Sequence, residues 1–172
     1  MRVGIDIDGT VTQTFELWEE LVPAFDRKYL NSESATVAPE MVREWYAAHQ
    51  KVLRRLYQPY PGTIAILHLL DNPRFITGRN TQHEVCPATV LWLHRHGLSH
   101  ISLTHTTDKV FAGRDVDVFI EDNPDHAQAL AHAGKPVLLK DQPYNQDVEH
   151  ENIIRFTHWL EVPRLLKKLQ KQ

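Results

Sequence analysis

The stretch Val3-Gly4-Ile5-Asp6-Ile7-Asp8-Gly9-Thr10 decides the fold of this chain. An apolar run comes first, and two aspartates, a glycine and a threonine follow it, which is typical of a short strand that ends in a polar turn. In open parallel α/β sheets, ligands bind beyond the carboxyl ends of the strands. The pattern therefore predicts a functional site where this first strand ends.

Three later segments fit this beginning. Thr77-Gly78-Arg79 follows the run Phe75-Ile76, Glu121-Asp122 follows Val118-Phe119-Ile120, and Lys109 lies between these two segments. Each acidic or hydroxyl group stands at the carboxyl end of a predicted strand. Two carboxylate clusters, a threonine and a lysine that converge at one edge predict a magnesium-assisted phosphoryl-transfer site.

Composition sets limits on the class of protein. The chain has 172 residues, which suggests one domain with room for a small insertion. Its 19 basic and 22 acidic residues give a net charge of −3, so we expect no polymeric nucleic acid as a partner and no general attraction to membranes. One cysteine excludes an intramolecular disulfide, and we find no signal-peptide pattern or bilayer-length apolar run. We therefore expect a soluble, cytoplasmic protein.

Strand-like and helix-like segments alternate along the chain. We predict strands over residues 2–6, 74–77, 101–103, 116–121 and 136–139, with a sixth over 153–156, and helices over 81–97, 123–133 and 162–169. This alternation predicts an α/β fold, a Rossmann-like parallel sheet with helices on both faces.

The first crossover is unusually long. About 65 residues separate Asp8 from the next predicted strand, far more than an ordinary strand-to-helix unit needs. We interpret the excess as two helices over residues 15–30 and 39–57, which form a small helical cap inserted after the first strand. The predicted division is a catalytic core of residues 1–12 and 60–172 and a cap of residues 13–59.

The residue types suit hydrolysis of a phosphate ester. Asp6 can act as the nucleophile and form an aspartyl-phosphate, which splits one difficult step into two easier ones. Asp8, two residues further on, can protonate the leaving oxygen and later activate water. The nearby Asp6 carboxylate favours that role, because two neighbouring carboxylates raise one apparent pKa of the pair and so let one of them hold a proton.

The other predicted site residues would surround the phosphate. Gly9 and Thr10 form the turn that brings backbone amides to it, and Gly9 permits a sharp bend. The Thr77 hydroxyl, the Gly78 amide and the Lys109 ammonium would contact phosphate oxygens. Glu121 and Asp122 would complete an oxygen-rich site for Mg²⁺, which usually takes one or two carboxylates together with waters and phosphate.

In this order, the residues resemble the four motifs of the haloacid dehalogenase superfamily of phosphatases: Asp6-x-Asp8-Gly-Thr, Thr77, Lys109 and Glu121-Asp122. The segments Gly-Ile-Asp-Ile-Asp-Gly-Thr, Phe-Ile-Thr-Gly-Arg, Phe-Ile-Glu-Asp-Asn-Pro and Pro136-Val-Leu-Leu-Lys-Asp-Gln-Pro-Tyr-Asn145 look like a bacterial group of nucleotidases related to the 5′(3′)-deoxyribonucleotidases.

This resemblance implies particular roles. Asp6 would be nucleophile and metal ligand, and Asp8 would be acid and base and bind the metal through its backbone carbonyl. Asp122 would be a side-chain ligand, with Glu121 binding directly or through water. The chain departs from the family at His126, where many members carry a further acid, and this puts the outer support of the metal site in doubt.

The substrate is the most open question. Phe15 and Trp18, like Trp45 and Tyr46, either pack the cap or form an aromatic wall that stacks on a nucleobase. Arg79 is either a surface or helix-start charge or a substrate contact. The resemblance favours a nucleoside monophosphate. A sugar phosphate or another small phosphorylated metabolite is the alternative substrate, and a catalytically silent nucleotide-binding protein is the alternative function.

Overall fold

A six-stranded parallel sheet forms the centre of the computed structural model, which describes residues 1–21, 25, 27, 57–79 and 85–171. The strand order is β3-β2-β1-β4-β5-β6. The strands are β1 (Val3–Ile5), β2 (Pro73–Thr77), β3 (Ser102–His105), β4 (Val118–Glu121), β5 (Val137–Lys140) and β6 (Ile153–Phe156). Since β1 lies between β2 and β4, the chain changes direction across the sheet at β1, where such folds bind ligands.

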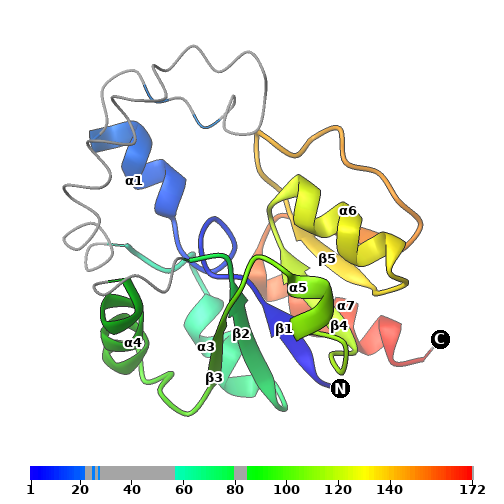
Figure 1. Cartoon of the computed structure of the whole chain (residues 1–172), viewed down its shortest axis with the longest axis horizontal. Helices are drawn as coiled ribbons and strands as arrows, with labels where there is room; N and C mark the ends of the chain where they lie inside the picture. The colour runs from blue at the N-terminus through cyan, green and yellow to red at the C-terminus, as the bar shows by residue number, and fades with distance from the viewer. Residues whose placement is uncertain (22–24, 26, 28–56, 80–84, 172) are drawn as a thin grey trace.

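Helices cover both faces of this sheet (Figure 1). The chain supplies α1 (Thr14–Leu21), α3 (Thr63–Leu69), α4 (Val85–Arg95), α5 (Lys109–Ala112), α6 (Pro124–His132), the 3-10 turn η2 (Trp159–Glu161) and α7 (Val162–Leu169). Helices α3, α4 and α7 pack in one apolar cluster, while α5 and α6 pack in the other. The alternation of strand side chains explains the division: Val118 and Ile120 of β4 join the first cluster and Phe119 the second.

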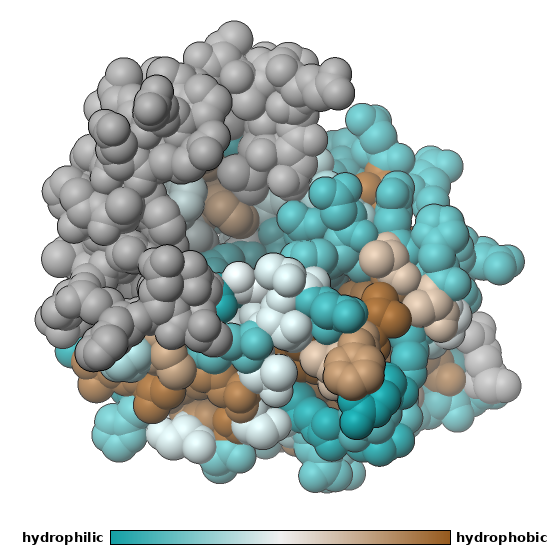
Figure 2. Space-filling model, in the orientation of Figure 1, coloured by the Kyte–Doolittle hydropathy of each residue, from teal (hydrophilic) through white to brown (hydrophobic). Residues whose placement is uncertain are grey.

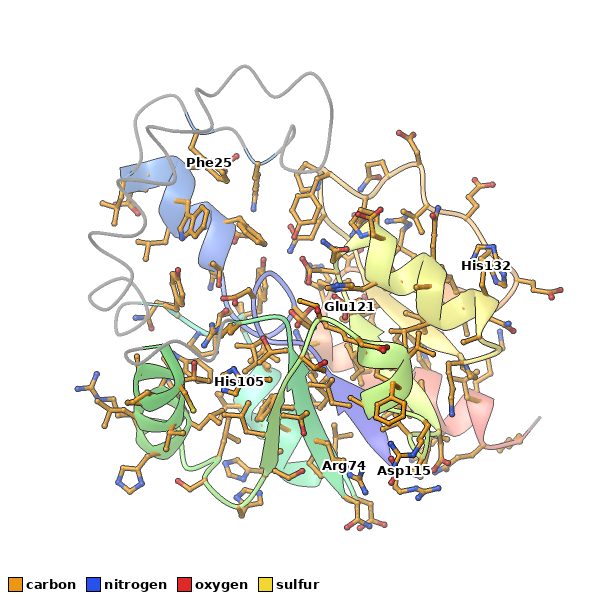
Figure 3. The ribbon with its side chains drawn as sticks, in the orientation of Figure 1. Phe25, Arg74, His105, Asp115, Glu121 and His132 are labelled. Atoms are coloured by element: carbon orange, nitrogen blue, oxygen red, sulfur yellow. The ribbon has the colours of Figure 1, made fainter. Side chains whose placement is uncertain are left out.

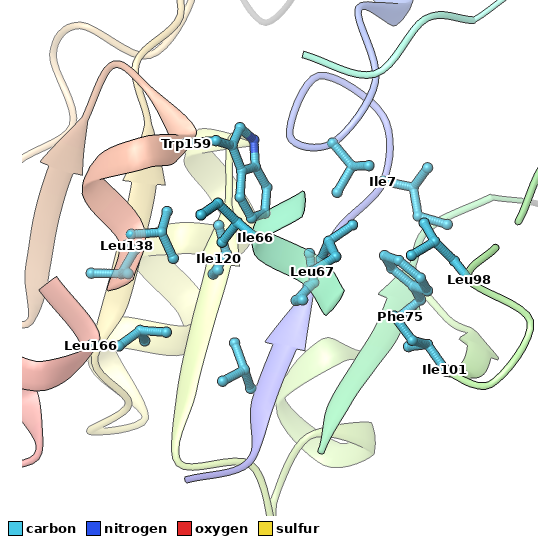
Figure 4. Packing of buried hydrophobic residues seen from close by; sticks show 14 of the residues in the cluster. Ile7, Ile66, Leu67, Phe75, Leu98, Ile101, Ile120, Leu138, Trp159 and Leu166 are labelled. Atoms are coloured by element: carbon cyan, nitrogen blue, oxygen red, sulfur yellow. The ribbon is translucent and has the colours of Figure 1, made fainter. Parts of the chain in front are cut away.

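The first cluster is the larger core. Figure 4 shows Phe75, Ile120 and Leu138 from three strands meeting Leu67 of α3 and Leu166 of α7. These side chains are buried, and parallel strands covered on both faces are expected to be continuously apolar in this way. The strand ends that carry polar residues are therefore fixed by a packed interior.

Two helix boundaries follow the usual rules of helix capping. Beyond α4, Gly97 has φ 71°, and the amide of Leu98 donates to the carbonyl of Leu93, which closes the helix. At the start of α6, the Asn123 side chain accepts from the amide of His126, and Pro124 occupies the first turn.

The predicted fold class is confirmed, including the sixth strand. The described strand and helix ends differ from the predicted ones by two residues or fewer, and residues 81–84 of one predicted helix lie outside the described part. Helices α3 and α5 were not predicted. Figure 1 shows α1 standing over the carboxyl edge of the sheet. Most of the predicted cap, with Trp45 and Tyr46, lies outside the described residues, so the division into core and cap stays a prediction.

The described surface is mostly polar with scattered apolar side chains. Figure 2 shows hydrophilic residues over α6 and a small hydrophobic area around α5, where Phe111 is 67% exposed. Single exposed apolar residues of this kind are ordinary in folded proteins. Among the helices that the structure describes, none combines the length and apolar character needed to cross a bilayer.

Candidate active site

The functional residues meet where β1 and β4 end side by side. The amide of Asp6 donates to the carbonyl of Ile120 at 3.0 Å, so the first residue after β1 is bonded to the last residue but one of β4. Figure 3 shows Glu121 in the middle of the molecule, where side chains from several elements converge. The parallel register thus brings together carboxylates that are more than a hundred residues apart in the sequence.

Three buried carboxylates form the centre of this site. One oxygen from each of Asp6, Glu121 and Asp122 lies within 4.8 Å of the others, which is close enough for all three to hold one metal ion. Lys109, the first residue of α5, donates from Nζ to Asp6 Oδ1 and to Glu121 Oε2, both at 2.6 Å. Its side chain is almost fully buried, so this pairing is not a surface ion pair.

Burial and crowding of charge set the protonation of these groups. Burial raises the pKa of Asp6 to about 7; the Lys109 ammonium opposes this effect, and Glu121 and Asp8 add to it. Burial, together with the charges of Asp6 and Glu121, raises the pKa of Asp122 well above its usual range. Burial also opposes ionisation of Glu121, but the charge and hydrogen bond of Lys109, together with His126, outweigh it and lower the pKa of Glu121.

Asp8 lies beside this cluster and is held by a buried arginine. Arg79 Nε donates to Asp8 Oδ2 and Nη2 donates to Oδ1, both at 2.6 Å. Thr14 of α1 adds a hydroxyl bond of 2.8 Å to Oδ1. Arg79 is only 5% exposed and also donates to Thr89, so the surface interpretation of Arg79 was wrong. Burial disfavours the charged guanidinium, but Asp8 outweighs it and raises the pKa of Arg79.

The turn after β1 is shaped by Gly9 and Thr10. Gly9 has φ 73°, and a Cβ there would overlap Asp122 Oδ2, so the position needs glycine both for its backbone and for space. Its amide donates to the carbonyl of Thr12 at 3.1 Å. The Thr10 hydroxyl is fully buried and donates to Asp122 Oδ1 at 2.6 Å. These groups, expected near the phosphate, thus support the turn and Asp122.

The remaining phosphate-contact candidates, Thr77 and Gly78, lie at the carboxyl end of β2. Thr77 is buried, its hydroxyl accepts from the Arg79 amide at 3.3 Å, and its carbonyl accepts from the Thr106 amide. Gly78 is open on its side-chain side, where the first atom that a Cβ would meet is His126 Cε1 at 3.8 Å. Since β2 pairs with β1 in parallel, both residues lie at the same sheet edge as Asp6.

The two aromatic candidates in α1 pack against each other and against the core. Phe15 makes edge contacts with Trp18 at 5.7 Å and with Tyr144 at 5.6 Å between ring centroids. Trp18 donates from Nε1 to the Tyr57 hydroxyl at 2.9 Å. Both rings are partly exposed. The two rings thus pack α1 against its neighbours and still leave part of their surface free to contact a substrate.

Sequence reasoning missed the residues that reach the site from the far end of the chain. The Tyr144 hydroxyl donates to Asp122 Oδ2, and Asn145 Nδ2 donates to the Asp122 carbonyl at 2.7 Å. Trp159 Nε1 donates to the Thr10 carbonyl at 2.9 Å. Tyr144 and Asn145 lie in the segment that carried the family resemblance, which was the one available signal. His126, the departure noted above, lies 3.8 Å from Glu121.

The charges and donor atoms of the site fit a hard cation. Asp6, Asp8, Glu121 and Asp122 bring four carboxylates, against which Lys109 and Arg79 bring two positive charges. Carboxylate oxygens are the ligands that magnesium and calcium prefer. Burial raises the pKa of Asp6 and of Asp122, and the neighbouring carboxylates add to this effect; a bound cation would relieve that crowding of negative charge.

Comparisons with known proteins agree with this geometry. A nucleotidase of Clostridium acetobutylicum is 31% identical over 185 residues, and the match covers 98% of this chain and 95% of that protein. No protein-family model matches the chain.

Solved structures show the same fold. A haloacid dehalogenase superfamily hydrolase of Geobacter sulfurreducens has a TM-score of 0.61 at 18% identity, with 95% of this chain and 98% of that chain covered. A haloacid dehalogenase-like protein of Agrobacterium tumefaciens has a TM-score of 0.63 at 11% identity, with 98% of each chain covered.

Fold and relatives together define a hydrolase of phosphoric monoesters. The chain belongs to the family of the Clostridium nucleotidase, and its fold is that of haloacid dehalogenase superfamily hydrolases.

Proposed function

We propose that this protein is a magnesium-dependent nucleotidase that releases phosphate from nucleoside monophosphates through an aspartyl-phosphate on Asp6. The observation that carries the proposal is the buried group of Asp6, Glu121 and Asp122 with Lys109 bonded into it at 2.6 Å. An arrangement of this kind combines a nucleophile, metal ligands and a cation for the phosphoryl group in one place.

The chain's own residues divide the reaction between them. An oxygen of Asp6 attacks phosphorus, the bond from phosphorus to the ester oxygen breaks, and the leaving alcohol takes a proton from Asp8. In the second half, Asp8 accepts a proton from water, which attacks the phosphoryl group and frees Asp6. Arg79 stabilises the ionised form of Asp8, and the second half of the reaction needs this form as the base. In the first half, Asp8 must carry a proton, and protonation of Asp8 competes with the ion pair to Arg79.

The other residues position and stabilise the phosphoryl group. Lys109 and the backbone at Gly78 would contact its oxygens, with Thr77 at the same edge. Asp6, Asp122, Glu121 and the Asp8 carbonyl would hold Mg²⁺, which when bound offsets the negative charge that gathers on these oxygens. The Lys109 ammonium is already held by Asp6 and Glu121, so it stands at the nucleophile before substrate arrives.

Two observations support a nucleotide as substrate. The relative from Clostridium acetobutylicum carries the name nucleotidase. Phe15 and Trp18 stand at the start of α1, over the carboxyl edge of the sheet, and present partly exposed rings on which a base can stack. A sugar phosphate has no base to stack on these rings, so it would gain less binding energy from them.

A substrate panel tests this function. Phosphate release from ribo- and deoxyribonucleoside monophosphates and from sugar phosphates would be measured in magnesium and in EDTA. We expect turnover only with the metal, and kcat/KM highest for a subset of the nucleotides. Preference for sugar phosphates would contradict the nucleotide assignment, and full activity in EDTA would contradict the metal. Tight nucleotide binding without any turnover would favour the silent binding protein.

Cation affinity should depend on pH. The pKa of Asp6 is raised to about 7 and that of Asp122 is also raised, so protons occupy these ligands at low pH and must leave when the metal binds. We expect magnesium affinity to increase from about pH 6 to about pH 8, with proton release on binding. Calorimetry in two buffers of different ionisation enthalpy measures both quantities. A flat profile with no released proton would show that the cation binds elsewhere.

A further inference from the structure

Asp122, the first residue after β4, accepts hydrogen bonds from three residues that lie far from it in the sequence or in other segments of the chain. Thr10 donates its hydroxyl to Oδ1, Tyr144 donates its hydroxyl to Oδ2, and Asn145 donates its amide to the backbone carbonyl. Each carboxylate oxygen thus accepts one hydrogen bond from the protein and keeps lone-pair capacity for another partner. The orientation of this carboxylate is therefore decided by its neighbours as well as by β4.

Tyr144 differs from the other two donors, because it also touches the helix above the site. Its ring makes an edge contact with Phe15 of α1 at 5.6 Å and 83°. A Cβ placed on Gly9 would lie 2.6 Å from the Tyr144 hydroxyl and 2.8 Å from Phe15 Cε2. Four residues therefore lie close together here: Tyr144, Phe15, Gly9 and Asp122. The Phe15 ring of α1 packs against the Tyr144 ring, and the Tyr144 hydroxyl bonds Asp122, a candidate metal ligand.

The segment that carries Tyr144 is itself well fixed. Gln142 Nε2 donates to the Gly9 carbonyl at 2.7 Å, and the Gln142 amide donates to Asn145 Oδ1 at 3.2 Å. Arg155 of β6 donates from Nη1 to the same Asn145 oxygen at 2.7 Å. Gln142 and Asn145 are both buried. A tyrosine between two such anchors can hold its hydroxyl in a constant position.

We propose that Tyr144 is a positioning residue that orients Asp122 for the cation and connects this ligand to α1 through Phe15. The proposal rests on the proposed function, because it assumes that Asp122 binds the metal. Partners of this kind, which hydrogen-bond to a metal ligand, typically change metal affinity or activity by about 10- to 100-fold when they are removed. Without the hydroxyl, Asp122 loses the donor that fixes Oδ2 and can rotate.

Tyr144→Phe tests this role, because it keeps the ring and its contact with Phe15 and removes one hydroxyl. Tyr60→Phe is the matched control: the Tyr60 hydroxyl also donates to a carboxylate, that of Glu16, at 2.6 Å, but Glu16 is no candidate metal ligand. The Tyr60 hydroxyl also accepts from Gln142 Nε2 at 2.6 Å, but Gln142 keeps its bond to the Gly9 carbonyl in this variant. Binding of Mn²⁺ would be measured by the loss of its free-ion paramagnetic resonance signal, with Mg²⁺ as competitor. We expect about tenfold weaker binding in Tyr144→Phe and a near wild-type value in Tyr60→Phe.

A second readout separates positioning from general stability. In Tyr144→Phe, we expect the magnesium concentration for half-maximal activity to increase, with kcat largely recovered at saturating magnesium and an unchanged melting temperature. If the variant does not fold, Phe15→Leu, which removes only the supporting ring, should weaken Mn²⁺ binding in the same direction.

The outcomes distinguish the two proposals. Unchanged Mn²⁺ affinity in Tyr144→Phe, or in Phe15→Leu if only that variant folds, would overturn the role of Tyr144 while the function stands. Equal losses in Tyr144→Phe and Tyr60→Phe would also overturn it. Absence of Mn²⁺ binding in the wild-type protein would overturn the proposed metal site as well.

Discussion

Asp6→Asn should abolish phosphate release and leave the fold intact. The amide has nearly the shape of the carboxylate but cannot form an acyl phosphate, so the covalent route is lost and we expect a fall in kcat of about 10⁴-fold or more. The cost in stability should be small, because the amide oxygen of the variant can still accept from Lys109 Nζ and Glu121 still pairs with that ammonium. Steady-state kinetics and a thermal melt measure the two effects.

A matched aspartate provides the control. Asp115 pairs with Arg2 and Arg74, and Figure 3 shows Asp115 and Arg74 together at the edge of the molecule, well away from Glu121. Asp115→Asn removes an equivalent charge outside the site and should retain wild-type turnover. If Asp6→Asn kept full activity, the nucleophile would have to be another residue.

Lys109→Met should separate catalysis from cation binding. Its Nζ bonds Asp6 and Glu121 at 2.6 Å, and loss of a positioned charge at a phosphoryl group typically costs about 10²- to 10³-fold in rate. The affinity for Mn²⁺ or Mg²⁺ should increase, because the substitution removes a positive charge beside the metal ligands. The metal-free variant should be less stable by about 3–5 kcal/mol, since buried carboxylates lose their partner.

The measurements are kcat, Mn²⁺ affinity and melting temperature with and without magnesium. Lys135→Met is the control, because Lys135 bonds only the backbone carbonyls of Arg114 and Val116 among the contacts described and should leave turnover unchanged. Wild-type kcat in Lys109→Met would show that this lysine has a structural role alone, and weaker cation binding would contradict the assumed repulsion.

The sequence predicts that these polar residues converge, for a physical reason. All strands of a parallel sheet end at the same edge, so polar residues that directly follow apolar runs must come together there. Asp6, Thr77 and Glu121 each follow such a run, and the structure places all three at that edge. The parallel sheet itself followed from the alternation of strands and helices, whereas the order of its strands comes from the structure.

Side-chain partners could not be predicted in the same way. The bond between Arg79 and Asp8 spans 71 residues, and that between Tyr144 and Asp122 spans 22. Such pairs depend on the path of loops and on the choice of rotamers, which leave no periodic trace in a sequence. Phe15 illustrates the point, because its aromatic character predicts packing or stacking but not its contact with Tyr144.

Two helices were missed because their sequences lack a helical pattern. In α3, Thr63–Leu69 is almost continuously apolar, and a short run of this kind does not distinguish a buried helix from a strand. In α5, four residues are too few to show a period, although Asp108 caps the helix by accepting from the Phe111 amide. Since Lys109 begins α5, the exact placement of its ammonium also lay beyond the sequence.

The most direct test of the central claim is to trap the covalent intermediate. The protein would be mixed with magnesium and a nucleoside monophosphate that it hydrolyses, quenched in acid, reduced with borohydride and digested. We predict that mass spectrometry finds residue 6 converted to homoserine, the product of a reduced aspartyl-phosphate, and that Asp6→Asn yields none. Rapid turnover with an unmodified Asp6 peptide, or with a phosphoryl group on another residue, would contradict the account.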